Sequence, residues 1–136
     1  LDGFPVSTVE GHTGRFVLGY IDDIPLIIMQ GRVHYYEGYT MEDVVLPIRL
    51  MRLMGAEVLF VTNASGGINE NFTAGDFMLI DDHISLFIPS PLIGQNLDKL
   101  GTRFPDMTQA YDAELKKAIL DAATQLNQDI KRGVYV

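Results

Sequence analysis

Apolar runs that end in polar or glycine-rich loops recur along the 136-residue chain. The apolar segments 15–21 and 24–30 are separated by a polar pair at 22–23, which predicts a β-hairpin. Two further apolar runs, 57–62 and 77–80, predict a third and a fourth strand. The third strand follows a predicted helix, so we expect it to lie parallel to the second strand of the hairpin.

The first predicted helix carries start and stop signals. Thr40 is a good N-cap because Asp43 follows three residues later, which permits a capping box. We expect the helix to run to about Met54 and to end at Gly55. Pro47 interrupts this pattern and predicts a kink or a later helix start.

The last third of the chain begins with residues 87–107, which have no periodicity and predict a long functional or interface loop. Thr108 is then the expected N-cap of a second helix, and a β-like stub at 134–136 follows. The helix carries an apolar stripe at i, i+3, i+4 spacing, which predicts packing against a core. Its members are Leu115, Ala118, Ile119, Ala122, Ala123 and Leu126.

Composition narrows the class of protein. Residues 1–136 suffice for a single domain, which we expect to be incomplete at both ends because it starts at Leu1 and stops within a strand pattern. No apolar run approaches the roughly 20 residues of a membrane span, so we expect no membrane partner. The net charge of −8 argues against nucleic acid as a partner. The absence of cysteine excludes a thiol nucleophile and fits a cytoplasmic protein.

Arg32, His34 and Tyr36 alternate directly after the second predicted strand, so an extended backbone points them to one side. A guanidinium matches the oxygens of phosphate, and an imidazole can donate to a phosphate oxygen or a sugar hydroxyl. Glu37 can hold that imidazole in one tautomer and favour its charged form. From spacing alone, an ordinary polar surface strand is an equal alternative.

The segment 62–67, Thr-Asn-Ala-Ser-Gly-Gly, offers backbone amides with little side-chain bulk. A flat ring or an anion can approach such a main chain, although a plain strand-to-loop turn explains it as well. His12, which lies between Gly11 and Gly14, is either a further donor or a loop residue. The three histidines lack an i, i+4 pair and a cysteine partner, so we expect no metal site.

Two long motifs at 31–39 and 61–67 closely resemble those of purine nucleoside phosphorylases of the homotrimeric class, and the loop 91–94 resembles bacterial members. Further matching segments follow in the family's order at 4–12, 75–84 and 103–107. The resemblance implies an α/β fold, a three-layer sandwich around a mixed, partly barrel-like sheet of the nucleoside phosphorylase type. It also implies reversible phosphorolysis of purine nucleosides such as inosine and guanosine to free base and (deoxy)ribose 1-phosphate, in purine salvage. Phosphate is then a co-substrate and no cofactor is expected.

The resemblance also implies residue roles. The catalytic pair is His34 and Glu37. The phosphate-binding residues are His12, Arg32, His34 and Ala64. The nucleoside-binding residues are Tyr36, Asn63, Ala64, Gly66 and Phe104. In the family an aromatic at the position of Phe104 caps the ribose pocket of the neighbouring subunit, which implies a homotrimer. The residues that hold the purine would lie outside the chain, so we expect residues 1–136 alone to show negligible phosphorolysis.

Three alternatives stay open. A methylthioadenosine phosphorylase performs the same chemistry on another nucleoside, although the residues at 37–39 favour the purine nucleoside class. A nucleoside hydrolase would hold calcium in an aspartate cluster, and the pair at 22–23 lacks that pattern. A non-catalytic phosphate-binding or oligomer-forming module would bind phosphate without turnover.

Overall fold

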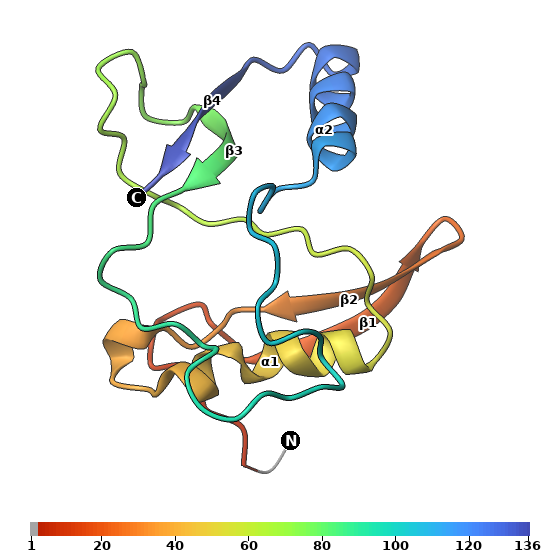
Figure 1. The fold of residues 1–136 in the computed structure, drawn as a ribbon. Helices are drawn as coiled ribbons and strands as arrows, with labels where there is room; N and C mark the ends of the chain where they lie inside the picture. The colour runs from red at the N-terminus through yellow and green to blue at the C-terminus, as the bar shows by residue number, and fades with distance from the viewer. Residues whose placement is uncertain (1–2) are drawn as a thin grey trace. The chain divides into compact units, whose positions relative to one another are not determined.

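The computed structural model describes residues 3–136, which divide into two compact units. Unit 1 comprises the described part of Leu1–Phe60 together with Pro89–Arg103. Unit 2 comprises Val61–Ile88 and Phe104–Val136. Figure 1 labels the helices and strands of both units.

Unit 1 begins with the expected hairpin. Strand β1 (Arg15–Ile21) pairs antiparallel with β2 (Ile24–Gln30), in a register that joins Ile21 to Ile24 across the turn. Asp22 adopts φ 51° there, a left-handed conformation that aspartate tolerates better than most residues. The hairpin prediction is confirmed, with the same bounds.

Helix α1 (Met41–Leu53) starts and ends where its caps predict. Thr40 Oγ1 accepts the Asp43 N–H at 3.2 Å, and the Asp43 carboxylate accepts the Thr40 N–H at 3.1 Å. At the other end Gly55, at φ +102°, donates to the carbonyl of Arg52, which closes the helix. The late start expected from Pro47 is wrong, because a proline removes one backbone hydrogen bond while the capping box secures the first turn.

Residues 57–62 were expected to form a strand parallel to β2, and this prediction is wrong. The segment is irregular, and Val58 and Phe60 are 59% and 71% exposed. An apolar run supplies suitable side chains for a strand, but its backbone donors and acceptors need a neighbouring strand. Among residues 3–136, β2 pairs with β1 alone.

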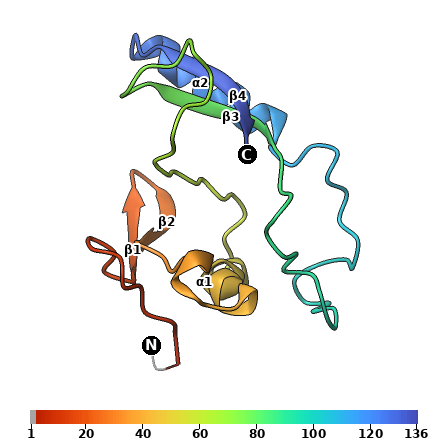
Figure 2. The same cartoon turned by 90° about the vertical axis from the view of Figure 1, so that its left-hand side faces the viewer.

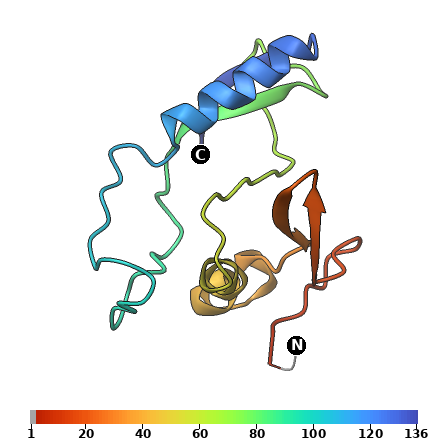
Figure 3. The ribbon, with the colours of Figure 1, turned by 90° about the vertical axis from the view of Figure 1, so that its right-hand side faces the viewer.

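In unit 2, β3 (Phe77–His83) pairs in parallel with β4 (Ile130–Tyr135), and the crossover between them contains α2 (Ala113–Gln125). Figures 2 and 3 show α2 lying along this two-stranded sheet. The fourth predicted strand is confirmed and extends to His83, and the predicted terminal stub is the end of a longer strand. The irregular loop expected at 87–107 is also confirmed.

The predicted N-cap of α2 is wrong. The Thr108 hydroxyl donates to Asp106, whereas the Asp112 carboxylate accepts the Leu115 N–H at 2.9 Å and caps the helix. The expected core stripe is buried only at Ala123, while Leu126 is 78% exposed. A stripe is buried only where another surface covers it, and the described part of unit 2 offers only a small sheet.

Candidate phosphate and nucleoside site

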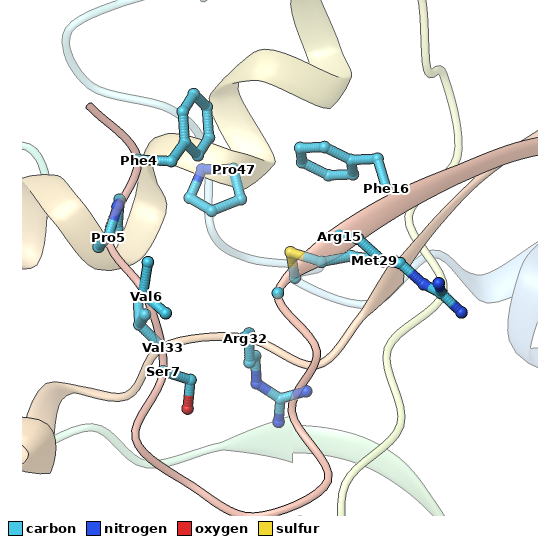
Figure 4. Close-up of a pocket in the computed structure, with 11 residues that line it drawn as sticks. Phe4, Pro5, Val6, Ser7, Arg15, Phe16, Met29, Arg32, Val33 and Pro47 are labelled. Carbon is cyan, nitrogen blue, oxygen red and sulfur yellow. The ribbon is translucent and has the colours of Figure 1, made fainter. Parts of the chain in front are cut away.

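A cavity of about 370 Å³ opens in unit 1 between the hairpin, the loop before it and α1 (Figure 4). Most of its wall is apolar, and the lining residue Val33 is only 4% exposed. Arg32 and Ser7 contribute polar side chains to the lining, and Arg15 contributes a second guanidinium. The expected phosphate ligand Arg32 therefore lies at a hollow with donors around it.

Three aromatic rings stack beside this segment. The rings of His12 and His34 have centroids 4.9 Å apart and planes at 28°, and those of His34 and Tyr36 have centroids 4.7 Å apart and planes at 15°. We call these three side chains the ring column. The extended backbone that was expected stops at His34, because Tyr35–Glu37 forms a short 3-10 helix, η1. This turn, and not strand alternation, brings the imidazole and the phenol together.

Glu37 anchors the middle ring of the column. Its Oε1 lies 2.7 Å from His34 Nδ1 and accepts the His34 backbone N–H at 2.7 Å. Its Oε2 accepts the Thr8 N–H at 2.7 Å and the Thr8 hydroxyl at 2.9 Å. The Ser7 hydroxyl reaches both oxygens, at 3.2 and 3.1 Å. The Glu37 side chain is consequently only 3% exposed.

The charge of Glu37 decides the tautomer of its partner. Desolvation raises the pKa of Glu37, but the hydrogen bonds from Thr8 and His34 outweigh it and lower the pKa from 4.5 to about 2. An ionised carboxylate can only accept, so His34 Nδ1 must carry the proton that lies between them. This leaves Nε2 of His34 as the ring atom for a ligand.

His12 is held by backbone contacts. Its Nδ1 lies 2.8 Å from the Arg32 carbonyl oxygen and donates to it. Gly31, at φ +77°, lets the two segments approach so closely that a Cβ on Gly31 would lie 2.5 Å from His12 Cα. The turn at Gly31 thus fixes His12 against Arg32.

The structure brings five expected site residues together in unit 1, and these are His12, Arg32, His34, Tyr36 and Glu37. Asn63, Ala64, Gly66 and Phe104 belong to unit 2. Asn63 Nδ2 donates to the Ala64 carbonyl at 3.1 Å and to the Tyr135 hydroxyl at 3.3 Å. Phe104 is 84% exposed.

Sequence reasoning missed Ser7, Thr8 and Gly31. The hydroxyls lie 30 and 29 residues before the carboxylate that they contact, and no local spacing indicates such a pair. Gly31 ended a predicted strand, where a turn is sufficient to explain a glycine. Only the fold shows that it also faces His12.

No helix among residues 3–136 has the length and apolar character needed to cross a membrane.

Comparison with known proteins identifies the relatives of the chain. It is 53% identical over 132 residues to purine nucleoside phosphorylase 1 of Bacillus subtilis, a match that covers 97% of this chain and 49% of the relative. It is 48% identical over 136 residues to purine nucleoside phosphorylase 1 of Geobacillus stearothermophilus, covering 100% of this chain and 50% of the relative. The chain thus spans about half the length of these relatives.

Solved structures agree with the sequence matches. The Schistosoma mansoni purine nucleoside phosphorylase in complex with inosine superposes with a TM-score of 0.88 at 41% identity, covering 98% of this chain and 49% of that one. A purine nucleoside phosphorylase in complex with ribose-1-phosphate gives a TM-score of 0.89 at 40% identity, covering 98% and 51%. The resemblance to purine nucleoside phosphorylases and the nucleoside phosphorylase type of fold are confirmed. The sequence model of the phosphorylase superfamily matches residues 1–136, and the chain therefore belongs to the phosphorylase superfamily.

Proposed function

We propose that this chain is part of a purine nucleoside phosphorylase, which converts inosine- and guanosine-type nucleosides and phosphate to free purine and (deoxy)ribose 1-phosphate. The observation that carries the proposal is the ring column with its ionised anchor, next to Arg32, in a chain 53% identical to such an enzyme. In the reaction a phosphate oxygen forms a bond to C1′ of the sugar, and the bond from C1′ to the purine nitrogen breaks. The electron pair leaves with the base, which then takes up a proton.

The side chains of unit 1 suit the phosphate half of this chemistry. Arg32 supplies positive charge at the cavity. Because Nδ1 of His34 is hydrogen-bonded to Glu37, Nε2 is the ring nitrogen that remains to contact a ligand. Catalysis by phosphorolysis depends mainly on positioning the phosphate and stabilising charge on an oxocarbenium-like sugar. His12 adds a further phosphate contact in this scheme, and Tyr36 contacts the ribose.

We assign the wall of the ribose and purine subsite to Asn63, Ala64 and Gly66, with the Ala64 amide as a further phosphate donor. Relatives that bind inosine and ribose-1-phosphate support a nucleoside and phosphate as the ligands. We further propose a homotrimer in which Phe104 reaches the neighbouring ribose pocket. The complete protein would form one three-layer domain around a mixed, partly barrel-like sheet and would need no cofactor.

The test is purine release from inosine with and without phosphate, by residues 1–136 and by the full-length protein that contains them. We expect phosphate-dependent release from the full-length protein alone. Release without phosphate would indicate a nucleoside hydrolase, and phosphate binding without turnover would indicate a non-catalytic module. Faster turnover of methylthioadenosine than of inosine would favour the alternative phosphorylase.

Replacing the proposed phosphate ligand sharpens this test. Arg32→Gln in the full-length protein should raise the KM for phosphate by at least about tenfold, because a charge-assisted contact is lost. Arg52→Gln is the matched control, since this exposed guanidinium donates to the Ala56 carbonyl at the end of α1. An equal effect of both substitutions on the KM for phosphate would contradict the assignment of Arg32.

A further inference from the structure

The Glu37 carboxylate accepts hydrogen bonds from two parts of the chain. His34 approaches Oε1 through both its backbone N–H and Nδ1, each at 2.7 Å. Thr8 approaches Oε2 through its backbone N–H and its hydroxyl, at 2.7 and 2.9 Å. The Ser7 hydroxyl bridges the two oxygens. The carboxylate therefore joins η1 to a loop about 30 residues earlier in the chain.

Further hydrogen bonds hold the loop that carries Ser7 and Thr8. The Tyr39 hydroxyl donates to the Val6 carbonyl at 2.5 Å, and the Val9 N–H donates to the Ser7 hydroxyl at 3.1 Å. Ser7 also lines the cavity that Arg32 lines. The Tyr39 contact thus fastens the loop just before the two hydroxyls, and the contact of Val9 with Ser7 closes a turn within the loop.

Hydrogen bonds on both oxygens affect the orientation of the carboxylate, because the terminal torsion of a glutamate side chain is soft and has no sharp staggered minima. A carboxylate that met only His34 could rotate and offer either oxygen in a range of orientations. Donors on Oε2 stop this rotation and direct Oε1 at His34 Nδ1. They also favour the ionised form, which agrees with the low pKa of Glu37, about 2.

We propose that Ser7 and Thr8 are positioning residues that lock the Glu37 carboxylate, and through it the orientation and tautomer of His34, for phosphate binding. This inference rests on the proposed phosphorylase function. Neither hydroxyl touches substrate in the scheme. They act by keeping Nδ1 of His34 protonated and the ring stacked between His12 and Tyr36.

The test uses Thr8→Val in the full-length protein, because valine keeps the shape and the backbone N–H of threonine and removes only the hydroxyl. We expect the KM for phosphate to rise by up to about tenfold, because the loss of one hydrogen bond to the charged Glu37 weakens the hold on His34, which contacts phosphate in this scheme. The KM for inosine should stay unchanged, and Thr8→Ser should restore the wild-type value. The matched control is Thr124→Val, which removes an exposed hydroxyl that donates to the Leu120 carbonyl on α2.

A second readout does not depend on turnover. The ¹⁵N chemical shifts of His34 should report the Nδ1–H tautomer in the wild type and a smaller fraction of this tautomer in Thr8→Val, in which the carboxylate can rotate away from Nδ1. A double-mutant cycle adds Glu37→Gln, in which the effect of Thr8→Val on the KM for phosphate should disappear because the carboxylate that it acts through is gone. Ser7→Ala provides an independent variant should Thr8→Val fold poorly, and its effect should have the same direction.

The outcomes separate this inference from the proposed function. An active wild type with an unchanged KM for phosphate and unchanged His34 shifts in Thr8→Val would overturn the inference and leave the function standing. A wild type without phosphate-dependent turnover would overturn the function. In that case unchanged His34 shifts in Thr8→Val would overturn the positioning role as well, and altered shifts would support the lock on His34.

Discussion

Gly31 offers the sharpest perturbation of the candidate site. It follows β2 directly, adopts φ +77° and faces the backbone of His12. A Cβ at this position would lie 2.5 Å from His12 Cα and 2.7 Å from His12 Cβ. Because the nearest atom belongs to the backbone, rotating a side chain cannot relieve the clash. Gly31→Ala must therefore move His12 away from Arg32 or unfold the turn.

Two contributions set the expected losses of stability and activity in Gly31→Ala. Placing a non-glycine residue at positive φ costs about 1–2 kcal/mol of stability. Restoring ordinary contact, 3.4 Å or more, from 2.5 Å displaces His12 by about 0.9 Å. That shift disturbs both the 2.8 Å contact of His12 Nδ1 with the Arg32 carbonyl and the stack on His34. A misplacement of about 1 Å in a site of this kind can reduce the rate about 100-fold.

The assay is phosphate-dependent purine release from inosine by the full-length protein, with thermal unfolding measured in parallel. Gly55→Ala is the matched control, because Gly55 has φ +102° and a Cβ there would meet nothing within 4 Å. Both variants should lose stability from backbone strain, and Gly31→Ala should lose more because it also clashes with His12. Only Gly31→Ala should lose about 100-fold in kcat/KM for phosphate. Equal activities of the two variants would refute the idea that close contact at Gly31 places His12.

Two further predictions concern stability. Although desolvation raises the pKa of Glu37, hydrogen bonds hold it at about 2 in the folded chain, against 4.5 for an ordinary glutamate. Its ionised form therefore stabilises the fold fully above pH 4.5, and this contribution is lost as the pH falls towards 2. In urea unfolding, the difference in unfolding free energy between wild type and Glu37→Gln should shrink as the pH falls from 4.5 towards 2. A difference that stays constant over this range would show that the ionised form of Glu37 does not stabilise the fold. Asp112→Ala should lower the unfolding free energy by about 1 kcal/mol because it removes the cap of α2, while Thr108→Ala should have little effect. A larger loss of unfolding free energy in Thr108→Ala than in Asp112→Ala would show instead that Thr108 caps the helix, as the sequence predicts.

The elements that sequence predicts well are those whose partners lie nearby in the chain. The hairpin needs only two apolar strands and a polar turn, and α1 needs only Thr40, Asp43 and Gly55 at its ends. The same local chemistry misled the prediction for α2, where two residues with capping side chains, Thr108 and Asp112, lie four positions apart. A four-residue error in the cap follows when spacing alone must choose between them.

Elements that depend on distant partners were predicted less well. Residues 57–62 have the side chains of a strand, yet a strand exists only where another backbone lies beside it. The apolar stripe of α2 has the right period for a core, yet only Ala123 is buried. Both patterns describe what a segment can bury, and neither specifies what covers it.

In the candidate site, the Glu37 carboxylate makes one contact that sequence can predict and one that it cannot. The contact between Glu37 and His34 is readable from the sequence, because residues three apart meet across a single turn. A carboxylate, however, has two oxygens, and the second is satisfied by Thr8, which no local pattern connects to it. If the first contact alone set the tautomer of His34, the motif at 31–39 would be sufficient for the phosphate site wherever it occurs. Because the second contact stops the carboxylate from rotating, the motif depends on a loop from another part of the chain, and the segment at 4–12 has to accompany it.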